Sequence, residues 1–559
     1  MTDLERTGSG RGSGTGSAVL DEAHVGDIRG ALGTISEEDL GPRRGLPARL
    51  KTLVAIIGPG LIVMVGDNDA GAFSTYSQAG QDYGTRLLWT LLLLVPVLYV
   101  NQEMVVRLGA VTGVGHARLI LERFGRFWGA FSVIDLFLLN ALTIITEFIG
   151  ISLGLSYLGL PTVPGVLVAA ALVIGTAATG SFRRFEQLCL VLVVGNLLLI
   201  PILIMAHPPI GHIAHDFVVP GLPAGAELST VMLLIIGIVG TTVAPWQLFF
   251  QQSYIIDKRI TPRFIGYEKV DLWVGIVIVV VGAAAMMAFA TAAFTGHPEF
   301  GNFTDAGGVA TGLGTYAGKA AGVLFALALI DASVIGAAAV GLATSYALGD
   351  VLGMRHSLHR GVRDAKGFYA VFAAVILLAA VIVVLPESPL GLVTEGVQTL
   401  AGVLLPSATV FLLLLCNDRQ VLGPWVNRTP MNVFTSVVIG VLVMLSIILT
   451  AGVLYPDISA TVIVGILVGG SGLGVLGGLG LLIAGRRSRR RGTTTAESDD
   501  GAGGAGGDRS SWRMPPLVLL TRPQLSRGRR LGLTVLRGYL VVAVVMVVAR
   551  IAELAVAGR

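Results

Sequence analysis

The sequence predicts an all-α polytopic membrane protein, and three observations support this class. The chain has 559 residues, of which 53% are hydrophobic and 13% are charged. Its mean hydropathy is +0.79. Apolar segments long enough to cross a bilayer, about 20 residues each, follow one another along the chain. Because hydrocarbon offers no partners to the backbone, each segment is expected to be a helix. We expect one membrane domain with polar tails.

Residues 1–44 come first and are rich in Gly, Ser, Thr and charged residues. Such a composition cannot bury enough apolar area to offset the entropy of ordering, so it predicts a disordered tail. The segment lacks the basic-then-apolar order of a secretory signal. The first true span is therefore expected to direct insertion.

Twelve apolar segments form the predicted membrane core, residues 45–485. Their approximate limits are 52–78, 86–110, 128–158, 163–180, 187–206, 229–254, 272–295, 319–348, 368–385, 391–416, 432–455 and 458–485. Lys and Arg precede the first segment and follow every even-numbered one, whereas the other loops contain almost none.

This alternation of basic loops predicts the orientation, because Lys and Arg concentrate in cytoplasmic loops. Both ends of the core, and hence the N-terminal tail, are expected in the cytoplasm, with the cell membrane as the location. The net charge of +4 is then a topology signal. Nucleic acid is not an expected partner, and protein partners are unknown from the sequence.

The chain ends in two further segments. Residues 486–514 are basic and Gly-rich and predict a disordered linker. Residues 515–559 contain an apolar stretch at about 531–556, whose uncharged core is short and has charged residues on both sides. This stretch is either a thirteenth span or an interfacial helix, and we favour a membrane-associated helix.

Signatures of enzymes and metal clusters do not stand out. The phosphate-cradling GxxxxGK[ST] and the zinc-protease HExxH are both absent, so we expect neither a catalytic site nor ATP-driven chemistry within this chain. Cys189 and Cys416 lie in or beside separate apolar segments. Their placement favours neither a disulfide framework nor a zinc site.

Two apolar segments carry helix-breaking residues. The first reads GPGLIVMVGDNDAGAFSTY over residues 58–76, and the sixth reads GIVGTTVAPWQLFFQQS from residue 237. Each ionised carboxylate of Asp67 and Asp69 would cost roughly 2.5–3.5 kcal/mol at membrane depth, so something must offset that cost. Gly and Pro free backbone groups that a cavity or a bound ion can use. Breaks in segments one and six predict two five-segment inverted repeats with a substrate site between them.

At these residues the chain resembles the Nramp family of divalent metal transporters. The family motif Asp-Pro-Gly-Asn resembles GDNDAGA here, with Asp69 and Gly71 as its Asp and Gly. The sixth-helix motif Met-Pro-His resembles Ala244-Pro245-Trp246. QEMVVRLGAVTG at 102–113, TEFIG at 146–150 and LLPSATVFLLLLCNDRQVLG at 404–423 are further matches. The resemblance covers about residues 50–455 and implies a LeuT-like five-plus-five fold that works by alternating access, with additional C-terminal helices.

The departures from the family pattern predict the ion. The resemblance implies a metal site of Asp, Asn and Met side chains with freed carbonyls, but Ala72 stands at the Asn position and Ala244 at the Met position. The donors that remain are oxygens, and they are the carboxylates of Asp69 and Asp67, the carbonyls near Gly66 and Thr241, and the amides of Gln247 and Gln398. Such a set suits hard cations. It resembles the Nramp-related magnesium transporters, which implies Mg²⁺ transport with Mn²⁺ also accepted.

Proton coupling is expected to be weak or absent. The resemblance implies an Asp-x-x-Glu pattern and a His as proton carriers. Glu147 is present, but Ile144 stands at the Asp position and Trp246 at the His position, where an indole cannot titrate. Ala72, Ala244 and Trp246 would then shape the site. Glu147 and Asp331, a further carboxylate deep in a span, are candidates for the ion pathway.

Several alternatives stay open at this point. Asp67 could cap a half-helix instead of attracting or binding the ion. The chain could be a proton-coupled Mn²⁺ or Fe²⁺ symporter, a sodium-coupled amino acid transporter or, in a different class, a metal-sensing membrane receptor. A fixed carboxylate at Asp69 argues against an amino acid substrate, because it would repel the substrate carboxylate. The transported divalent ion is substrate, and no cofactor is expected.

Overall fold

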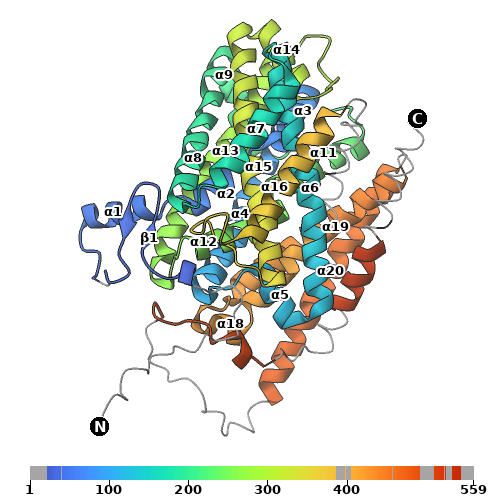
Figure 1. Ribbon diagram of the computed structural model, residues 1–559. Coiled ribbons are helices and arrows are strands. Elements are labelled where there is room, and N and C mark those ends of the chain that lie inside the picture. The colour runs from blue at the N-terminus through green and yellow to red at the C-terminus, as the bar shows by residue number, and fades with distance from the viewer. Residues whose placement is uncertain are drawn as a thin grey trace, which may run out of the picture.

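The computed structural model describes residues 22–39, 41–385, 397, 405–455, 458–491, 509–521, 523, 532–542 and 545. These residues form an elongated helical bundle (Figure 1). Their only sheet is a short antiparallel hairpin of β1 (Ile28–Arg29) and β2 (Thr34–Ile35) near the N-terminal end of the chain.

The helices follow the predicted segments in order, and every predicted segment contains a helix. Their bounds are α1 Leu46–Ile56, α2 Pro59–Val65, α3 Ala70–Tyr83, α4 Trp89–Thr112, α5 His116–Phe124, α6 Arg126–Tyr157, α7 Thr162–Ala177, α8 Phe182–Gly195, α9 Leu199–Ala206, α10 Ile210–Val218, α11 Leu228–Thr242, α12 Pro245–Asp257, α13 Ile265–Phe294, α14 Ala306–Tyr316, α15 Lys319–Leu352, α16 Lys366–Val384, Leu405–Cys416, α18 Arg419–Leu422, α19 Thr429–Leu454, α20 Ala460–Arg491 and Gly532–Val542. Short 3₁₀ turns, η1–η5 and η7, lie at Glu22–His24, Gly84–Leu87, Asn196–Leu198, Pro262–Phe264, Gly423–Trp425 and Leu517–Leu519.

Eight helices of the described chain are long and apolar enough to cross a membrane, or up to nine if α1 and α2, which are bent by 52°, form one span. The other predicted segments hold shorter apolar helices or, in the first segment, the α2–α3 pair. We regard α2 and α3 as the broken first span, because α1 projects from the side of the bundle (Figure 1) and exposes Leu46, Leu50 and Val54.

Small residues bring the first span against α13. A Cβ on Gly60 would lie 2.7 Å from the Leu272 nitrogen, and one on Gly80 would lie 2.3 Å from the Met287 carbonyl oxygen. Such close approach between membrane helices needs glycine. The α2–α3 pair is thereby fixed at the centre of the bundle, between α13 and the helices that carry the second break.

The N-terminal segment differs from the prediction of a disordered tail over residues 22–39. Arg259 donates hydrogen bonds to the Ala23 and Asp27 carbonyls, and the Ala31 N–H donates to Glu186 Oε2 at 2.5 Å. Few of these residues are apolar, so composition suggested no core. The order comes from polar partners more than 150 residues away in the chain, together with burial of Ile28 and Ile35 in the core. Residues 1–21 lie outside the described part.

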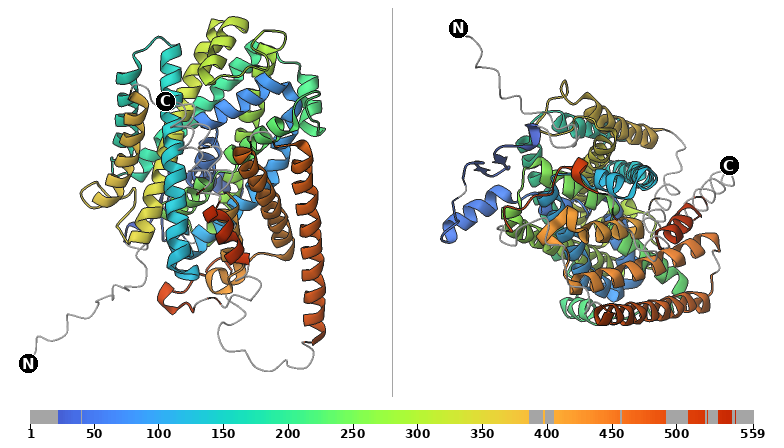
Figure 2. Two further views of the ribbon diagram at one scale, coloured as in Figure 1. Left: turned by 90° about the vertical axis from the view of Figure 1, so that its right-hand side faces the viewer. Right: turned by 90° about the horizontal axis from the view of Figure 1, so that it is seen from below.

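The C-terminal helices are arranged at one side. Helices α19 and α20 pack against each other and lie along an edge of the bundle (Figure 2). The backbone of α20 stays helical through the basic run to Arg491, where a linker was predicted. Residues 509–521 lie near α18 at the end of the bundle where the hairpin also lies (Figure 1).

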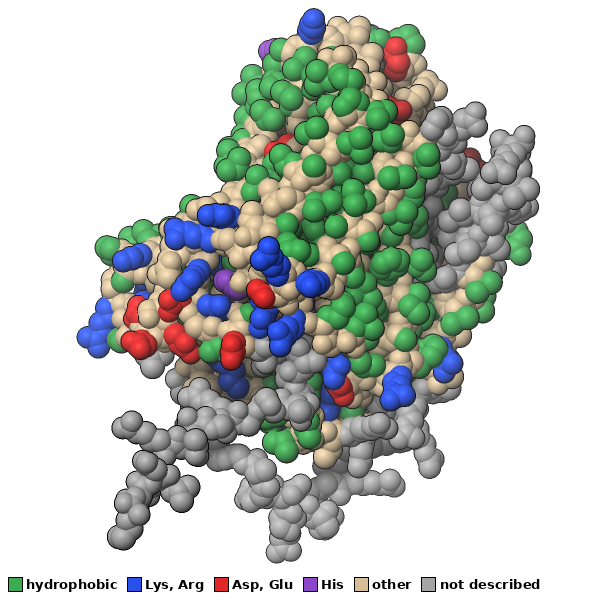
Figure 3. Space-filling view, viewed as in Figure 1, with side chains coloured by type: hydrophobic (Ala, Val, Ile, Leu, Met, Phe, Trp, Pro, Cys, Tyr) green, Lys and Arg blue, Asp and Glu red, His purple; other side chains and the backbone are tan. Residues whose placement is uncertain are grey.

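Charge is unevenly distributed over the surface. Figure 3 shows Lys and Arg gathered around the hairpin and the lower end of the bundle, below a broad apolar face. This separation is the one that the basic loops predict. We refer to this end as the basic end, and the cytoplasmic placement of the N-terminus stays a prediction.

Candidate functional site

The first break lies between α2 and α3, at residues 66–69. In a continuous helix the Ala70 N–H would donate to the Gly66 carbonyl. Here it donates to Glu147 Oε2 on α6, at 3.1 Å. The Gly66 carbonyl therefore loses its helical donor and is available to a ligand. Glu147 is fully buried, so it supports the break from within the bundle.

Asp69 ends the break as the N-cap of α3. Its Oδ1 accepts from the Ala72 N–H at 2.9 Å. This bond removes the donor that the Asn68 carbonyl would have in a helix. The capping role considered for Asp67 thus belongs to Asp69, because α3 begins at Ala70.

Asp67 is completely buried and joins the two broken helices. Gln247 Nε2 of α12 donates to Asp67 Oδ1, and Gln102 Nε2 of α4 donates to Gln247 Oε1 at 2.9 Å. Asp67 Oδ2 has no partner among the described residues. Asp67 therefore holds the inner side of the break together, and one of its oxygens is unused.

The second break lies between α11 and α12, at Val243 and Ala244. Pro245 has no N–H, so the Thr241 carbonyl has no donor four residues on. The neighbouring Thr242 carbonyl accepts a hydrogen bond from the side chain of Gln247, from Nε2 at 3.3 Å. Tyr76 of α3 and the Thr242 hydroxyl share a 2.7 Å hydrogen bond, which fixes the two breaks side by side.

A cavity of about 50 Å³ lies where the breaks meet. Its lining is Asp69, Gly71, Leu139, Thr143, Thr146, Gly237, Gly240, Thr241, Ala244, Trp246 and Val397. One carboxylate, three Thr residues and backbone carbonyls are its possible ligands. Within the described chain, no Met, Cys or His lines it, and no group of three His, Cys, Asp or Glu residues could hold a metal.

The predicted site residues separate into two groups. Asp69, Thr241, Ala244 and Trp246 line the cavity, whereas the buried Gly66, Asp67, Ala72 and Gln247 lie beside it without lining it. Gln398 lies outside the described residues.

Asp331 is not part of this site. A Cβ on Gly195 of α8 would lie 2.3 Å from Asp331 Oδ2, so this carboxylate packs against α8. It lines neither the small cavity nor the adjoining larger cavity of about 590 Å³.

The larger cavity, of about 590 Å³, continues from the small one through Gly71 and Thr146. Asp82 and Asp305 line it near the end of α3 that lies away from the basic end. Acidic groups at a cavity mouth raise the local concentration of cations. The arrangement is open toward the end opposite the basic one.

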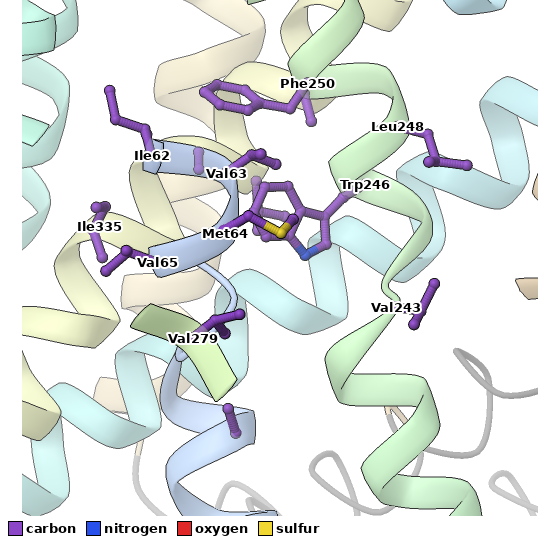
Figure 4. Packing of buried hydrophobic residues seen from close by; sticks show 14 of the residues in the cluster. Ile62, Val63, Met64, Val65, Val243, Trp246, Leu248, Phe250, Val279 and Ile335 are labelled. Carbon is purple, nitrogen blue, oxygen red and sulfur yellow. The ribbon is translucent and has the colours of Figure 1, made fainter. Parts of the chain in front are cut away.

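Aromatic side chains close the site toward the basic end. Trp246 is 1% exposed and reaches from α12 toward Met64 of α2 (Figure 4). Its ring lies 6.1 Å from that of Phe250, which stacks 5.0 Å from Tyr254. Among the described residues, these side chains separate the small cavity from the basic end.

A buried charge pair beneath this closure was missed from the sequence. Lys258 Nζ lies 2.7 Å from Glu186 Oε1, and both side chains are fully buried. Lys258 also donates to the Ile56 and Ile57 carbonyls just before α2. Both residues stand next to basic loops, whose Lys and Arg residues indicate topology but not which of them is buried.

Comparison with known proteins agrees with the geometry. The family model described as Natural resistance-associated macrophage protein-like, Nramp, matches residues 60–452. The divalent metal cation transporter MntH of Burkholderia ambifaria is 28% identical over 410 residues, covering 70% of this chain and 87% of the relative. The protein of the same name from Ralstonia nicotianae is 30% identical over 401 residues, covering 67% and 86%.

A solved structure supports the fold. The Eremococcus coleocola manganese transporter superposes with a TM-score of 0.62 at 21% identity, covering 83% of this chain and 98% of that chain. The family model spans more than half of the present chain, and the breaks lie within the matched residues. The chain therefore belongs to the Nramp family of divalent metal transporters, which are integral membrane carriers and not enzymes.

Proposed function

We propose that this protein carries hard divalent cations, Mg²⁺ and also Mn²⁺, by alternating access. The observation that carries the proposal is the donor set of the small cavity, which consists of oxygen in its described part. Carboxylate, hydroxyl and carbonyl oxygens suit Mg²⁺ and Mn²⁺. A thioether, which would favour softer ions, is missing at Ala244.

The size of the cavity supports the same ion. Its volume of about 50 Å³ is several times the space that one water needs. Mg²⁺ dehydrates reluctantly and usually keeps several waters while one or two carboxylates bind it. Ala244 leaves that room open, and Asp69 supplies the carboxylate. The ion would bind partly hydrated at Asp69. Gly66, Asp67 and the carboxamide of Gln247 would lie behind the cavity lining and support it.

The charge distribution supports uptake into the cell. The outer cavity carries Asp82 and Asp305, and the basic end lies opposite. If the basic end is cytoplasmic, as the loops predict, the site is open to the outside. A negative membrane potential then drives a divalent cation inward.

Weak proton coupling follows from the groups near the site. Trp246 cannot carry a proton, and Ile144 is a buried apolar residue. Glu147 Oε2 accepts from the Ala70 N–H, which gives Glu147 a structural task. The ion would move down its own gradient and the membrane potential.

Flux into proteoliposomes tests the ion. The purified full-length chain is expected to admit Mg²⁺ and Mn²⁺ and to discriminate against Cd²⁺ and Fe²⁺. Uptake of Cd²⁺ or Fe²⁺ without Mg²⁺ would instead favour the Mn²⁺ or Fe²⁺ symporter of the mainstream family type. The relatives are named as divalent metal cation transporters, which supports a divalent substrate but not the choice among ions.

A pH-sensitive dye inside the same vesicles tests coupling. Metal uptake should leave the internal pH almost unchanged while a potassium gradient with valinomycin sets the potential. Robust acidification that scales with metal uptake would overturn the proposal of weak coupling. The absence of any flux would favour the metal-sensing receptor.

A further inference from the structure

A second large cavity, of about 610 Å³, opens at the basic end of the bundle. It lies between α4, α13, the start of α19 and the segment that begins at residue 509. Its lining is Glu103, Arg107, Lys269, Trp425, Val426, Arg428, Pro430, Met431, Phe434 and Arg509. Glu103 and Arg107 belong to QEMVVRLGAVTG, of which the ion site uses only Gln102.

The single carboxylate of the described lining is already neutralised. Glu103 Oε2 accepts from Arg107 Nε at 2.9 Å, and Glu103 Oε1 lies 2.8 Å from Lys269 Nζ. The rest of the Arg107 guanidinium donates to the Trp425 carbonyl and to Asn427 Oδ1, at 2.5 and 2.6 Å. These contacts fix Arg107 at the inner wall of the cavity.

Arg428 and Arg509 add positive charge, and neither forms an ion pair with a carboxylate of the described residues. The Arg509 guanidinium lies 4.1 Å from the Trp425 ring centroid, and Trp425 Nε1 donates to the Arg509 carbonyl at 2.9 Å. Burial and the neighbouring charges of Arg428 and Arg107 lower the pKa of Arg509. Cations that converge and repel one another are stabilised when an anion lies between them.

The other walls of the cavity are apolar, at Pro430, Met431 and Phe434. The basic end of a membrane bundle lies at the level of lipid headgroups, where basic pockets between helices bind anionic headgroups. A free phosphate would use the guanidinium groups alone. A phospholipid would use the guanidinium groups for its phosphate and the apolar wall for the start of its acyl chains.

We propose that this cavity binds the phosphate of an anionic phospholipid headgroup, with Arg428 and Arg509 as its ligands at the rim and Arg107 and Lys269 at its inner wall. The assignment is independent of which metal ion the carrier moves. Arg forms bidentate hydrogen bonds to phosphate oxygens, and two rim guanidinium groups suit a single phosphate. The lipid would join residues 509–521 to the core through α4 and α19.

Native mass spectrometry of the full-length protein in mild detergent tests the site. Short-chain phosphatidylglycerol, phosphatidylcholine and soluble glycerol 3-phosphate are titrated separately. The variant Arg428→Gln/Arg509→Gln is compared with Arg183→Gln/Arg184→Gln, a matched loss of two exposed basic residues at the start of α8. The size-exclusion profile and the melting temperature of each variant verify that it is folded.

The parent should bind phosphatidylglycerol in preference to phosphatidylcholine, and the pocket variant should lose about thirtyfold in affinity. The control variant should stay within about twofold of the parent. An equal loss in both variants would show general surface attraction and overturn the site. Binding of glycerol 3-phosphate as tight as that of phosphatidylglycerol would overturn the lipid as its occupant, and so would equal binding of phosphatidylcholine.

Discussion

Replacing Ala244 with Met tests the oxygen-only cavity most directly. Ala244 is the N-cap of α12 and lines the small cavity beside Asp69 and Thr241. A Met side chain there would point a thioether into the space that we assign to the hydration shell. We expect transport to shift from Mg²⁺ toward Cd²⁺, because soft ligands select soft ions.

The size of the shift follows from the volume of the site. Met adds three non-hydrogen atoms to a cavity of about 50 Å³, which displaces most of the waters that fit there. Mg²⁺ then loses ligands that it gives up reluctantly, whereas Cd²⁺ gains a sulfur. One altered contact typically changes discrimination by about 10–200-fold. We expect the ratio of kcat/KM for Mg²⁺ over Cd²⁺ to fall by roughly 10- to 100-fold.

The assay is competitive uptake into proteoliposomes, with Mg²⁺ and Cd²⁺ indicators in parallel. Ala244→Leu is the matched control, because Leu adds similar bulk without sulfur. It should lower the transport of both ions and leave their ratio within about threefold of the parent. The reasoning is refuted if the Met and Leu variants change the ratio equally, or if Met leaves Mg²⁺ uptake intact.

Four further substitutions have expected outcomes. Asp69→Asn removes the one carboxylate of the described cavity lining and should reduce Mg²⁺ flux at least about a hundredfold. Asp331 lines neither the small nor the outer cavity, so the Mg²⁺ flux of Asp331→Asn should stay within about threefold of the parent. Glu186→Gln leaves a buried lysine without its carboxylate and should cost about 3–5 kcal/mol, measured as lower thermal stability and faster proteolysis of the N-terminal hairpin. Burial lowers the pKa of His356, but the Asp350 carboxylate at 3.2 Å outweighs it and raises the pKa above the ordinary value of 6.5. The ion pair stabilises the fold fully below pH 6.5, and this stabilisation is lost as pH rises through the raised pKa. The melting temperature of the parent should therefore fall by that contribution between pH 6 and 8.5, whereas the melting temperature of His356→Gln should not show this fall.

The sequence predicted the helical segments and both breaks, because these depend on local properties. A run of about 20 apolar residues and a Gly or Pro in its middle act through hydration and backbone chemistry alone. The same local rules could not decide between Asp67 and Asp69. The two residues are two positions apart, and their roles depend on where α3 begins and on Gln247, which lies 180 residues away.

Long-range contacts explain the other differences. The N-terminal hairpin looked disordered because its partners, Glu186 and Arg259, lie far along the chain. Asp331 was a candidate because a carboxylate within a span is usually functional, and its role in an ion pathway stays a prediction. Its surroundings depend on how α15 packs against α8, which hydropathy does not report.

We expect the two breaks also to determine how the carrier opens toward the basic end. Ahead of α2, Lys258 holds the Ile56 and Ile57 carbonyls, and Asp271 of α13 accepts from the Gly60 N–H at 2.7 Å. Each contact is polar and lies near the basic end, where water can replace it once the helix moves. The joints for such a movement are Gly58, whose φ of +151° suits only glycine, and the non-helical residues 66–69. A rotation of α2 about these joints would separate Met64 from Trp246 (Figure 4). It would also expose the freed carbonyls toward the basic end. We propose that the unwound backbone at residues 66–69 both offers oxygens to the ion and acts as the hinge for its release, so a substitution that makes these residues helical should weaken binding and inward opening together.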